Sequence, residues 1–517
     1  MKQRDPTALP RRLAASLVRR PLALCLPIQA ALLFANLGLL PAWGDEYASV
    51  GSAALPIGAL LAALHNDVHP PLYFVLLHGW QAALGAGSAL VSARALSALL
   101  VLAATLAIDR AWLRDLEPRS RAWFLLLWTL CPAMLLYGRM ARSYSLQVLL
   151  APLALYAGCR YARRASMMTW FAYVAPATAL LYTHYLPGIA VVAGVALPMT
   201  WLAVSRRQPA ALLPIVAAPA GIGLAFAPWL LHLTSAVGHV ATADRHHLFG
   251  RGLDTAAALA FTAVSFSIGE SVRPWMIGVL LALTPALAVL LVAGLRPAPP
   301  WLAVVAPAAL IATVGACRWV SYAFVAPRLL FLLPFYLLVL VRGARIRARL
   351  GNVVCAALAV ASCGGIAAYF GQIGFLNKAY VIPADAIARM IVADSDDTPV
   401  IVILDHYSTD LAAMLPYLPP DARILRITDA SSAAEAARLS NDEHIHQAWF
   451  AHSAHDVSPE HWNERVAAAF APRFTVQRTG FAPYSALDGW LMRLAGWSEQ
   501  PRYALELDEM RRTDAGR

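Results

Sequence analysis

Two adjacent acids stand out in the apolar first part of this chain. Asp45 and Glu46 come a few residues after the first apolar stretch. Ionisable groups near hydrocarbon are costly, so those that persist there usually mark a site. A carboxylate in such a place can act as a general base, taking a proton from an attacking hydroxyl. We therefore predict Asp45 to be a catalytic base, and we place the adjacent Glu46 in the same site.

Basic and aromatic residues gather around the same side of the predicted membrane. His69 precedes Pro70 and Pro71 at a helix start, and a helix N-terminus beside an imidazole suits an anionic phosphate. Arg139 and Arg142 are three residues apart, so we expect them on one side of a helix. The other candidates are tyrosines, a histidine and two late arginines: Tyr73, Tyr144, His184, Tyr185, Arg318 and Arg328.

Each cluster also has a structural interpretation. The acids could be solvated loop residues, and the His-Pro-Pro run could be only a helix start. The arginines could reach lipid head groups, and the histidine-tyrosine pair could belong to an interfacial belt. We assign Asp109 with Arg110, and Glu270 with Arg273, to structural ion pairs. The combination of clusters, rather than any one of them, favours a site.

Composition makes the chain an integral membrane protein. Hydrophobic residues make up 59% of the sequence, charged residues only 14%, and the mean hydropathy is +0.58. Residues 1–370 carry a net charge of +18 and residues 371–517 one of −7. The basic excess is an orientation signal, and no aromatic-basic stripe indicates nucleic acid. The six cysteines form no CxxC pair, so neither a disulfide framework nor a metal site with thiolate ligands is predicted.

The elements that must position these residues are membrane helices. Spans need about 20 mostly apolar residues, which predicts about eleven helices. They lie near residues 22–42, 93–113, 121–137, 145–160, 168–185, 187–204, 210–232, 275–294, 301–317, 327–341 and 352–370.

Basic loops orient these spans. Loops rich in arginine are predicted to be cytoplasmic, which places the N-terminus on that side of the membrane. The first apolar run is interpreted as a membrane span that is not cleaved as a signal peptide. Residues 43–92 and 233–273 then become outer loops, and residues 371–517 follow them outside. This implies a bacterial inner-membrane protein whose C-terminal domain is periplasmic.

The C-terminal part reads as a small α/β domain. Strand patterns occur at residues 400–404, 423–427, 447–450 and 474–476, with helices at 432–439 and 459–470. Histidines here could bind metal, although a solvated surface is the preferred interpretation: His444, His446, His452, His455 and His461. The run Asp405-His406-Tyr407-Ser408 holds triad-type residues, and we interpret it as a strand-to-helix turn.

The assortment on the outer face suits group transfer from a lipid-phosphate donor. A base would activate an acceptor hydroxyl for attack on an anomeric carbon, while fixed cations stabilise the departing phosphate. The main alternative is a transporter or flippase of lipid-linked saccharides. Such proteins show repeat symmetry and polar groups near the membrane centre, and neither is evident here.

Five spaced motifs resemble those of the C-type membrane glycosyltransferases, in particular the bacterial relatives of protein O-mannosyltransferases and lipid A aminoarabinose transferases. They are the acidic pair, His69-Pro-Pro-Leu-Tyr, Arg142-Ser-Tyr-Ser-Leu, Tyr182-Thr-His-Tyr and Pro327-Arg-Leu-Leu. The resemblance covers about residues 20–345 and implies an all-α membrane domain, which we extend over residues 1–370 from the apolar spans. The α/β domain at residues 371–517 is predicted from its own strand and helix patterns and lies outside the resemblance.

The same resemblance implies the chemistry. It implies a polyprenyl-phosphate sugar as donor, inversion at the anomeric carbon and Asp45 as the base. The acceptor is a lipid, glycan or protein. No cofactor is predicted, because no acidic cluster other than Asp45 and Glu46 indicates a divalent metal. His69, Arg139, Arg142 and Arg328 would hold the phosphate, and the remaining candidates would line the donor pocket. His69 stands where several relatives have Lys, and Val68 where the lipid A enzymes have Glu, so the match to an aminoarabinose donor is weaker.

Overall fold

The computed structural model describes residues 17–65, 69–84, 89–207, 212–243, 252–296, 304–305, 307–308, 326–395, 400–405, 409–427, 429–454, 461–494 and 502–513. The chain forms two compact units, which are described separately. Unit 1 consists of Met1–Leu37 and Ser49–Ile373, and unit 2 of Gly38–Ala48 and Gly374–Arg517.

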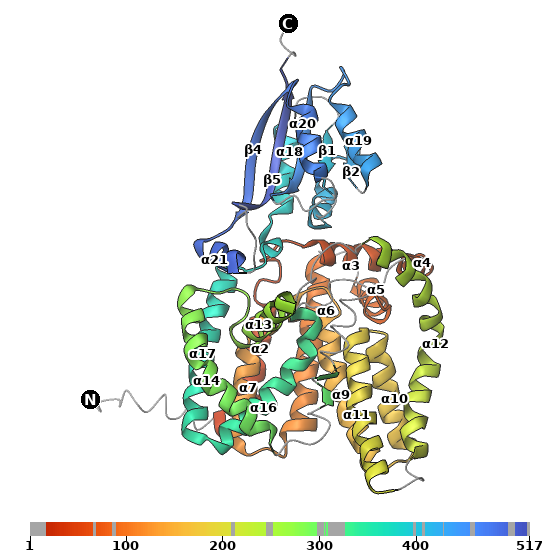
Figure 1. Ribbon diagram of the computed structural model, residues 1–517, viewed down its shortest axis with the longest axis vertical. Helices are drawn as coiled ribbons and strands as arrows, with labels where there is room; N and C mark the ends of the chain where they lie inside the picture. The colour runs from red at the N-terminus through yellow and green to blue at the C-terminus, as the bar shows by residue number, and fades with distance from the viewer. Residues whose placement is uncertain are drawn as a thin grey trace, which may run out of the picture. The chain divides into compact units, whose positions relative to one another are not determined.

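Unit 1 is helical (Figure 1). Its elements, of which α3 begins in unit 2, are α2 (Pro21–Phe34), α3 (Gly44–Ala54), α4 (Ile57–His65), α5 (Leu72–Leu84), α6 (Ala89–Ile108), the π-helical turn η1 (Asp109–Leu113), α7 (Pro118–Leu130), α8 (Pro132–Arg139), α9 (Tyr144–Arg163), α10 (Met167–Leu181), α11 (Tyr185–Ser205), α12 (Leu212–Ala243), α13 (Gly252–Ile268), α14 (Pro274–Leu295), the 3₁₀ segment η3 (Ala326–Leu332), α16 (Leu333–Ile346) and α17 (Ala348–Phe370).

Six stretches in the described part of unit 1 are long and apolar enough to cross a membrane, or seven if the bent pair α7–α8 is one span. Three further apolar helices, α2, α5 and α10, are shorter, and part of the chain lies outside the described residues, so the expected number of about eleven spans stays a prediction. The first helix ends at Phe34 rather than near residue 42, and the span expected at 121–137 bends by 53°. Pro132 explains the bend, because proline cannot donate the helical hydrogen bond. The span expected at 301–317 lies mostly outside the described residues.

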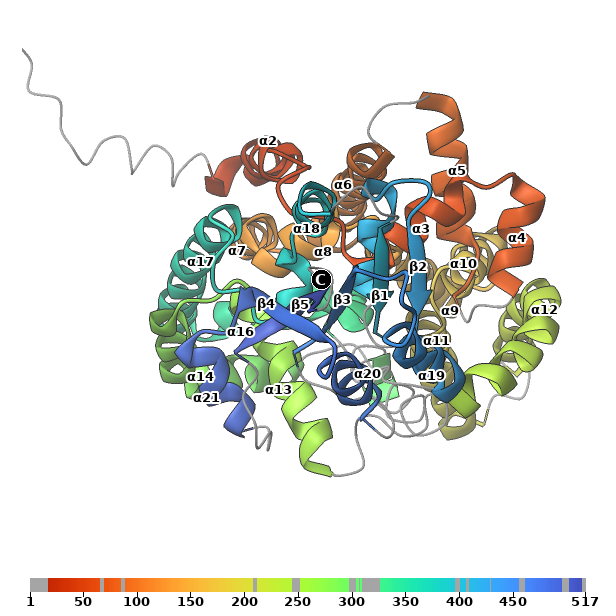
Figure 2. The same cartoon turned by 90° about the horizontal axis from the view of Figure 1, so that it is seen from above.

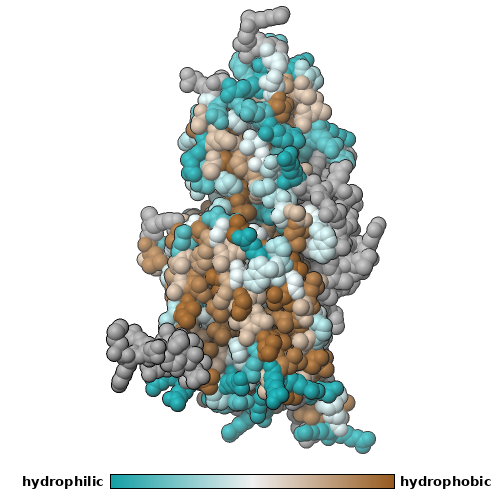
Figure 3. Space-filling view, turned by 90° about the vertical axis from the view of Figure 1, so that its left-hand side faces the viewer, coloured by the Kyte–Doolittle hydropathy of each residue, from teal (hydrophilic) through white to brown (hydrophobic). Residues whose placement is uncertain are grey.

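The surface of unit 1 carries apolar side chains of the kind that lipid covers. Figure 3 shows brown, apolar residues over the flank of this unit, with hydrophilic residues gathered below them. Exposed leucines and valines of α14 and α17, such as Leu281 and Val353, contribute to the apolar exposure. Such exposure is normal for helices that face hydrocarbon rather than water.

Helix direction gives unit 1 two distinct ends. Helices α9, α10 and α11 follow one another through short connections and pack side by side, so they alternate in direction. Tyr144 and Tyr185 therefore begin their helices at one end, here called the His69 end. Arg163 and Ser205 finish them at the other, here called the arginine end. Because α9 has 20 residues, the two ends are about 30 Å apart.

Unit 2 contains one five-stranded sheet in the order β2-β1-β3-β5-β4, seen side by side in Figure 2. Strands β1, β2 and β3 are parallel to one another, whereas β5 runs antiparallel to both β3 and β4. The elements are η4 (Lys378–Val381), α18 (Ala384–Ala393), β1 (Ile401–Leu404), η5 (Thr409–Tyr417), β2 (Arg423–Arg426), α19 (Ala430–Leu439), β3 (Gln447–Ser453), α20 (Trp462–Phe470), β4 (Phe474–Pro483), α21 (Ala486–Leu494) and β5 (Tyr503–Arg512).

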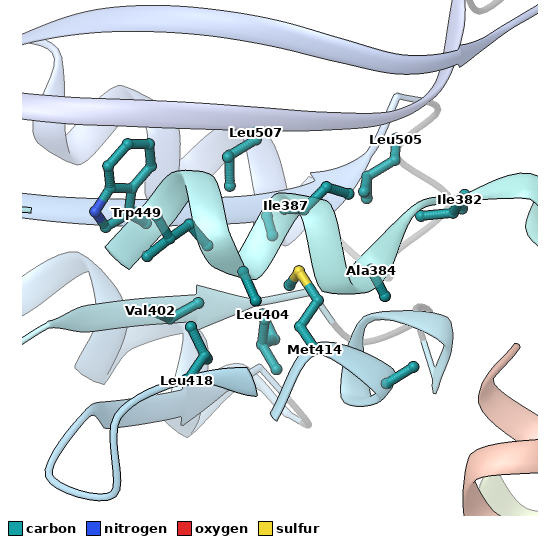
Figure 4. Packing of buried hydrophobic residues seen from close by; sticks show 14 residues of the cluster. Ile382, Ala384, Ile387, Val402, Leu404, Met414, Leu418, Trp449, Leu505 and Leu507 are labelled. Carbon is teal, nitrogen blue, oxygen red and sulfur yellow. The ribbon is translucent and has the colours of Figure 1, made fainter. Parts of the chain in front are cut away.

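Alternating residues of the central strands build two cores, one on each face of the sheet. On one face, Val402 and Leu404 of β1 pack with Ile387 of α18 (Figure 4). On the other, Ile401 and Ile403 pack with α19 and α20. Strand β1 is buried along its whole length, as expected for a parallel strand covered on both sides. The α/β prediction for this region is confirmed, although β5 had no predicted counterpart.

A buried charge group crosses the antiparallel half of the sheet. His452 of β3 bonds Asp508 of β5 at 3.2 Å, and Arg478 of β4 binds the same carboxylate at 2.6 and 2.8 Å. Burial is the largest single influence and would lower the pKa of His452. The hydrogen bond and the charge of Asp508, together with the backbone of Ser453, outweigh burial and raise this pKa. Burial would likewise raise the pKa of Asp508, whereas His452 and Arg478 lower it. The carboxylate of Asp508 thus favours the protonated form of His452.

This pair predicts a stability that falls as pH rises. Because the folded pKa of His452 is raised, its contribution is present below the unfolded pKa near 6.5 and is lost as pH rises through the folded value. Amide exchange in β3 and β5 of the full chain, corrected for intrinsic rates, should be slower at pH 6 than at pH 8.5. Asp508→Asn should remove this dependence and cost about 3 kcal/mol, because it breaks a buried pair.

Arg389→Gln provides the control for that experiment. Its partner Asp385 lies four residues away on exposed α18, at 2.7 Å. Exposed pairs contribute well under about 1 kcal/mol. Equal effects of the two substitutions on exchange would show that the His452–Asp508 pair is not a stabilising contact.

Candidate functional site

Arg142 lies at the centre of the basic residues of unit 1. Helix α8 ends at Arg139, Met140 is extended, and Arg142 occupies the turn before α9 begins. Its guanidinium donates from Nη1 to Ser49 Oγ and from Nη2 to His69 Nε2, both at 3.0 Å. The side chain is buried, with 7% exposed. Two partners from separate segments therefore fix the direction of this charge.

His184 comes next to this arginine from another helix. It caps α11, and its Nδ1 accepts a hydrogen bond from the backbone N–H of Leu186 at 3.3 Å. Burial lowers the pKa of His184 well below its usual value, and the nearby Arg328, His69 and Arg142 lower it further. The imidazole is therefore neutral at neutral pH. Since Nδ1 accepts, its proton is on Nε2, which can donate to a ligand.

His69, Arg142, His184 and Arg328 form what we call the basic cluster. They come from four segments: the approach to α5, the turn before α9, the cap of α11 and η3. Segment η3 is held against α9 by Gln147, whose amide approaches the carbonyl of Pro327 at 3.5 Å. All three groups that depress the pKa of His184 are bases, so the local potential is positive. A positive, half-enclosed cluster at a helix start suits an anion.

Arg139 is not part of this cluster. Its Nη2 donates to the carbonyls of Ala35 and Asn36, at the end of α2, and its guanidinium lies over the rings of Tyr369 and Phe370. The expectation that the two arginines share one side of a helix is wrong, because the chain leaves helical geometry between them. Arg139 instead stabilises the carbonyl end of α2, where a cation is favoured.

The predicted pocket residues have different surroundings. Tyr73 is 1% exposed, bonds Ser97 at 3.0 Å and packs inside an apolar core, so its position is that of a core residue. Tyr144 begins α9 two residues after Arg142 and packs edge-on against Tyr137. Tyr185 begins α11, and its hydroxyl accepts from Trp229 Nε1 at 2.9 Å.

Two sequence positions that matter to the predictions are not described. Arg318, a predicted pocket residue, lies outside the described residues, as does Val68, which differs from the lipid A enzymes. The placement of the basic cluster depends on neither of them.

The acidic pair occupies the first turn of α3, where carboxylates are favoured by the helix dipole. Glu46 is 1% exposed and Asp45 is half-buried. The segment that carries them belongs to unit 2, where Tyr47 packs against the core and Trp43 lies edge-on to Tyr380. Within the helix, Asp45 is one turn before Ser49, so both project from the same face of α3.

Glu270 is a buried acid that the sequence did not reveal as special. It lies between α13 and α14, is 2% exposed, and accepts hydrogen bonds from Tyr137 Oη and Ser265 Oγ. Glu270 is bound by these two hydroxyl groups rather than by Arg273, with which we expected it to pair and whose side chain is exposed. Burial raises the pKa of Glu270 to about 7, although its two hydroxyl partners oppose the rise. Because Tyr137 also contacts Tyr144, this acid borders the start of α9.

The alternatives in unit 2 gain little support from its described residues. Within those residues, no group of three or more His, Cys, Asp or Glu side chains is placed to hold a metal. His452 is bound to Asp508, and Asp405 accepts from the Ser453 backbone at 2.6 Å and from Asn463. Among the other residues of these two hypotheses, His406, Tyr407, Ser408 and His455 lie outside the described residues.

Two solved structures share this fold over nearly the whole chain. They are ArnT from Cupriavidus metallidurans in the apo state and the same protein bound to undecaprenyl phosphate. In each comparison the TM-score is 0.51 and the sequence identity 13%, over 94% of this chain and 97% of that one. No family model matches the sequence, and no curated protein matches it.

The likeness establishes the fold. This chain has the C-type membrane glycosyltransferase fold, with an α-helical membrane unit and a C-terminal α/β unit, as the sequence motifs predicted. ArnT is a protein to which this chain is similar in fold. With six or seven apolar spans among the described residues, the chain is a multi-pass membrane protein.

Glu270 predicts a second pH dependence, in unit 1. Its folded pKa is raised from 4.5 to about 7, so the folded protein favours the protonated carboxyl. Stability should be greatest at low pH and decline between about pH 4.5 and 7, by on the order of 3 kcal/mol. Melting temperatures of the detergent-purified chain should follow this decline. Glu270→Gln keeps the shape of the side chain and cannot ionise, so it should remove this decline of the melting temperature with pH. A decline that is unchanged in Glu270→Gln would contradict the assignment to Glu270.

Proposed function

We propose that this protein is an inverting glycosyltransferase that uses a polyprenyl-phosphate-linked sugar. It transfers the sugar to an acceptor hydroxyl on a lipid, glycan or protein at the outer face of the bacterial inner membrane. One observation carries the proposal: the basic cluster assembles from four segments at the His69 end of a chain with the C-type fold.

The proposed reaction is a single displacement. The acceptor hydroxyl attacks the anomeric carbon, and Asp45 takes its proton as general base. The bond between the anomeric carbon and the phosphate oxygen breaks, and its electron pair leaves with the polyprenyl phosphate. Attack opposite the leaving group inverts the anomeric carbon. Glu46 supports Asp45 or the acceptor.

In this proposal the basic cluster stabilises the phosphate that leaves. Arg142 and Arg328 supply permanent positive charge, which is strongest where water is excluded. His184 supplies a neutral N–H donor, and His69 holds the guanidinium of Arg142 in position. The arginines thus neutralise the leaving group, a task that a divalent cation performs in other enzymes. Tyr144 and Tyr185, at the starts of α9 and α11, would line the donor pocket.

The orientation of the chain belongs to the same proposal. Basic loops at the arginine end are cytoplasmic by the positive-inside rule. The His69 end then faces the periplasm, as does unit 2. A donor with a long lipid tail keeps its phosphate at the membrane surface. The residues of the basic cluster lie at the ends of membrane helices, and therefore at that depth. ArnT has been solved with undecaprenyl phosphate, a lipid of this class.

Transfer assays with a panel of labelled polyprenyl-phosphate sugars test the proposal directly. Purified protein in nanodiscs should turn over one donor in the presence of its acceptor. Asp45→Asn should reduce turnover by about 10²–10⁴-fold with donor binding retained, because only the base is lost. Arg142→Gln should reduce turnover by about 10²–10³-fold and also weaken binding of the bare polyprenyl phosphate.

Asp115→Asn is the matched control. Asp115 is an exposed carboxylate at the arginine end, so its loss should leave turnover unchanged. The wild type could bind a donor and yet turn over none of the panel, even with candidate acceptors present. That result would contradict the transferase proposal and favour a transporter. Full activity of Asp45→Asn would remove Asp45 from the mechanism but leave the transferase proposal intact.

A further inference from the structure

A cavity of about 740 Å³ opens at the arginine end of unit 1, away from the basic cluster. Its walls are formed by the C-terminal ends of η1, α9 and α16 and by the N-terminal end of α10. The basic cluster lies at the other end of α9, about 30 Å away. The cavity is therefore separate from the proposed donor site.

Arginine dominates the lining of this cavity. Five arginines and one aspartate line it, a net charge of +4. They are Arg114, Arg160, Arg163, Arg164 and Arg342, with Asp115. Asp115 pairs with Arg114 at 3.5 Å, and both side chains are exposed at the rim. The buried acid of η1, Asp109, is bound through both oxygens by Arg121, so its charge is already neutralised.

The helix dipole explains only part of this charge. Arg160 and Arg163 lie in the last turn of α9, where cations are favoured, although residues three or four apart repel each other. Arg342 lies before the last turn of α16, and its Nη1 is buried without a hydrogen-bond acceptor. Leaving a charged donor unpaired away from water is costly. The cavity thus lacks an anionic partner for at least one guanidinium.

The remaining walls of the cavity suit a lipid better than a free ion. Trp112 and Tyr156 stack edge-on and, with Leu338, form an apolar floor. The π-helical turn η1 carries Trp112, whose indole nitrogen donates to the carbonyl of Pro152 at 3.1 Å. Beside the cavity, the first turns of α10 expose Met168 and Phe171 at 78% and 58%. Acyl chains can follow such a surface.

We propose that this cavity binds the phosphate head group of an anionic phospholipid from the cytoplasmic leaflet. Arg342 and Arg160 bind the phosphate oxygens, the other arginines attract it, and the acyl chains run along α10. Basic pockets between membrane helices on the cytoplasmic side are a known way of holding anionic lipid head groups. The proposal does not depend on the identity of the donor or on Asp45.

Native mass spectrometry of the delipidated full chain tests this proposal. The wild type should bind phosphatidylglycerol with an affinity at least about tenfold higher than its affinity for phosphatidylcholine. Arg160→Gln with Arg342→Gln should weaken phosphatidylglycerol binding about thirtyfold, since each arginine near the surface contributes about 1 kcal/mol. Arg160→Lys with Arg342→Lys keeps the charges and should retain part of the affinity, which separates loss of binding from loss of fold.

The matched control removes two arginines from the same end but outside the cavity. Arg206 follows α11 and Arg349 begins α17, and both are exposed. Arg206→Gln with Arg349→Gln should change affinity by less than about twofold. The proposed site would be overturned if both glutamine double variants lost the same amount of phosphatidylglycerol affinity, or if neither lost any. Displacement of phosphatidylglycerol by millimolar inorganic phosphate would overturn the lipid as its ligand and assign the cavity to soluble phosphates.

Discussion

A guanidinium where an apolar helix begins must be held by polar partners, and unit 1 meets this constraint at Arg142. Ser49 and His69 bind its two terminal nitrogens, which ties α3 and the approach to α5 to the start of α9. The chain leaves helical geometry just before this residue, so Arg139 points instead to the carbonyl end of α2. The break between α8 and α9 thus decides which arginine serves the cluster and which the scaffold.

The length of α9 allows two positive regions to coexist in one membrane unit. Its start carries the basic cluster and its last turn borders the arginine cavity, about 30 Å away. Two unit charges about 30 Å apart interact by only about 0.6 kcal/mol at an effective dielectric constant of about 20, so neither region dominates the potential at the other. Each can therefore bind its own anion. The imidazoles at one end supply directed donors, and the guanidiniums at the other supply mostly charge.

Residues of the basic cluster were predictable because polar side chains at the ends of apolar segments are conspicuous. His69, Arg142, His184 and Arg328 were all found in this way. The turn that separates Arg139 from Arg142 was not visible, because nothing between them is a strong helix breaker. Tyr73 and Glu270 depend on contacts with residues distant in sequence. Strand β5 was missed because its charged residues become strand-like only between β3 and β4.

The segment Gly38–Ala48 gives the two units a boundary that no single cut in the chain can reproduce. It precedes most of unit 1 in sequence but packs with unit 2, through Trp43 beside Tyr380 and Tyr47 against the core. Ending the chain at Ile373 would strip these aromatic side chains of their partners. Exchange of the C-terminal unit between related proteins would therefore have to carry an N-terminal piece with it, and recombination at a single crossover would produce mismatched chains.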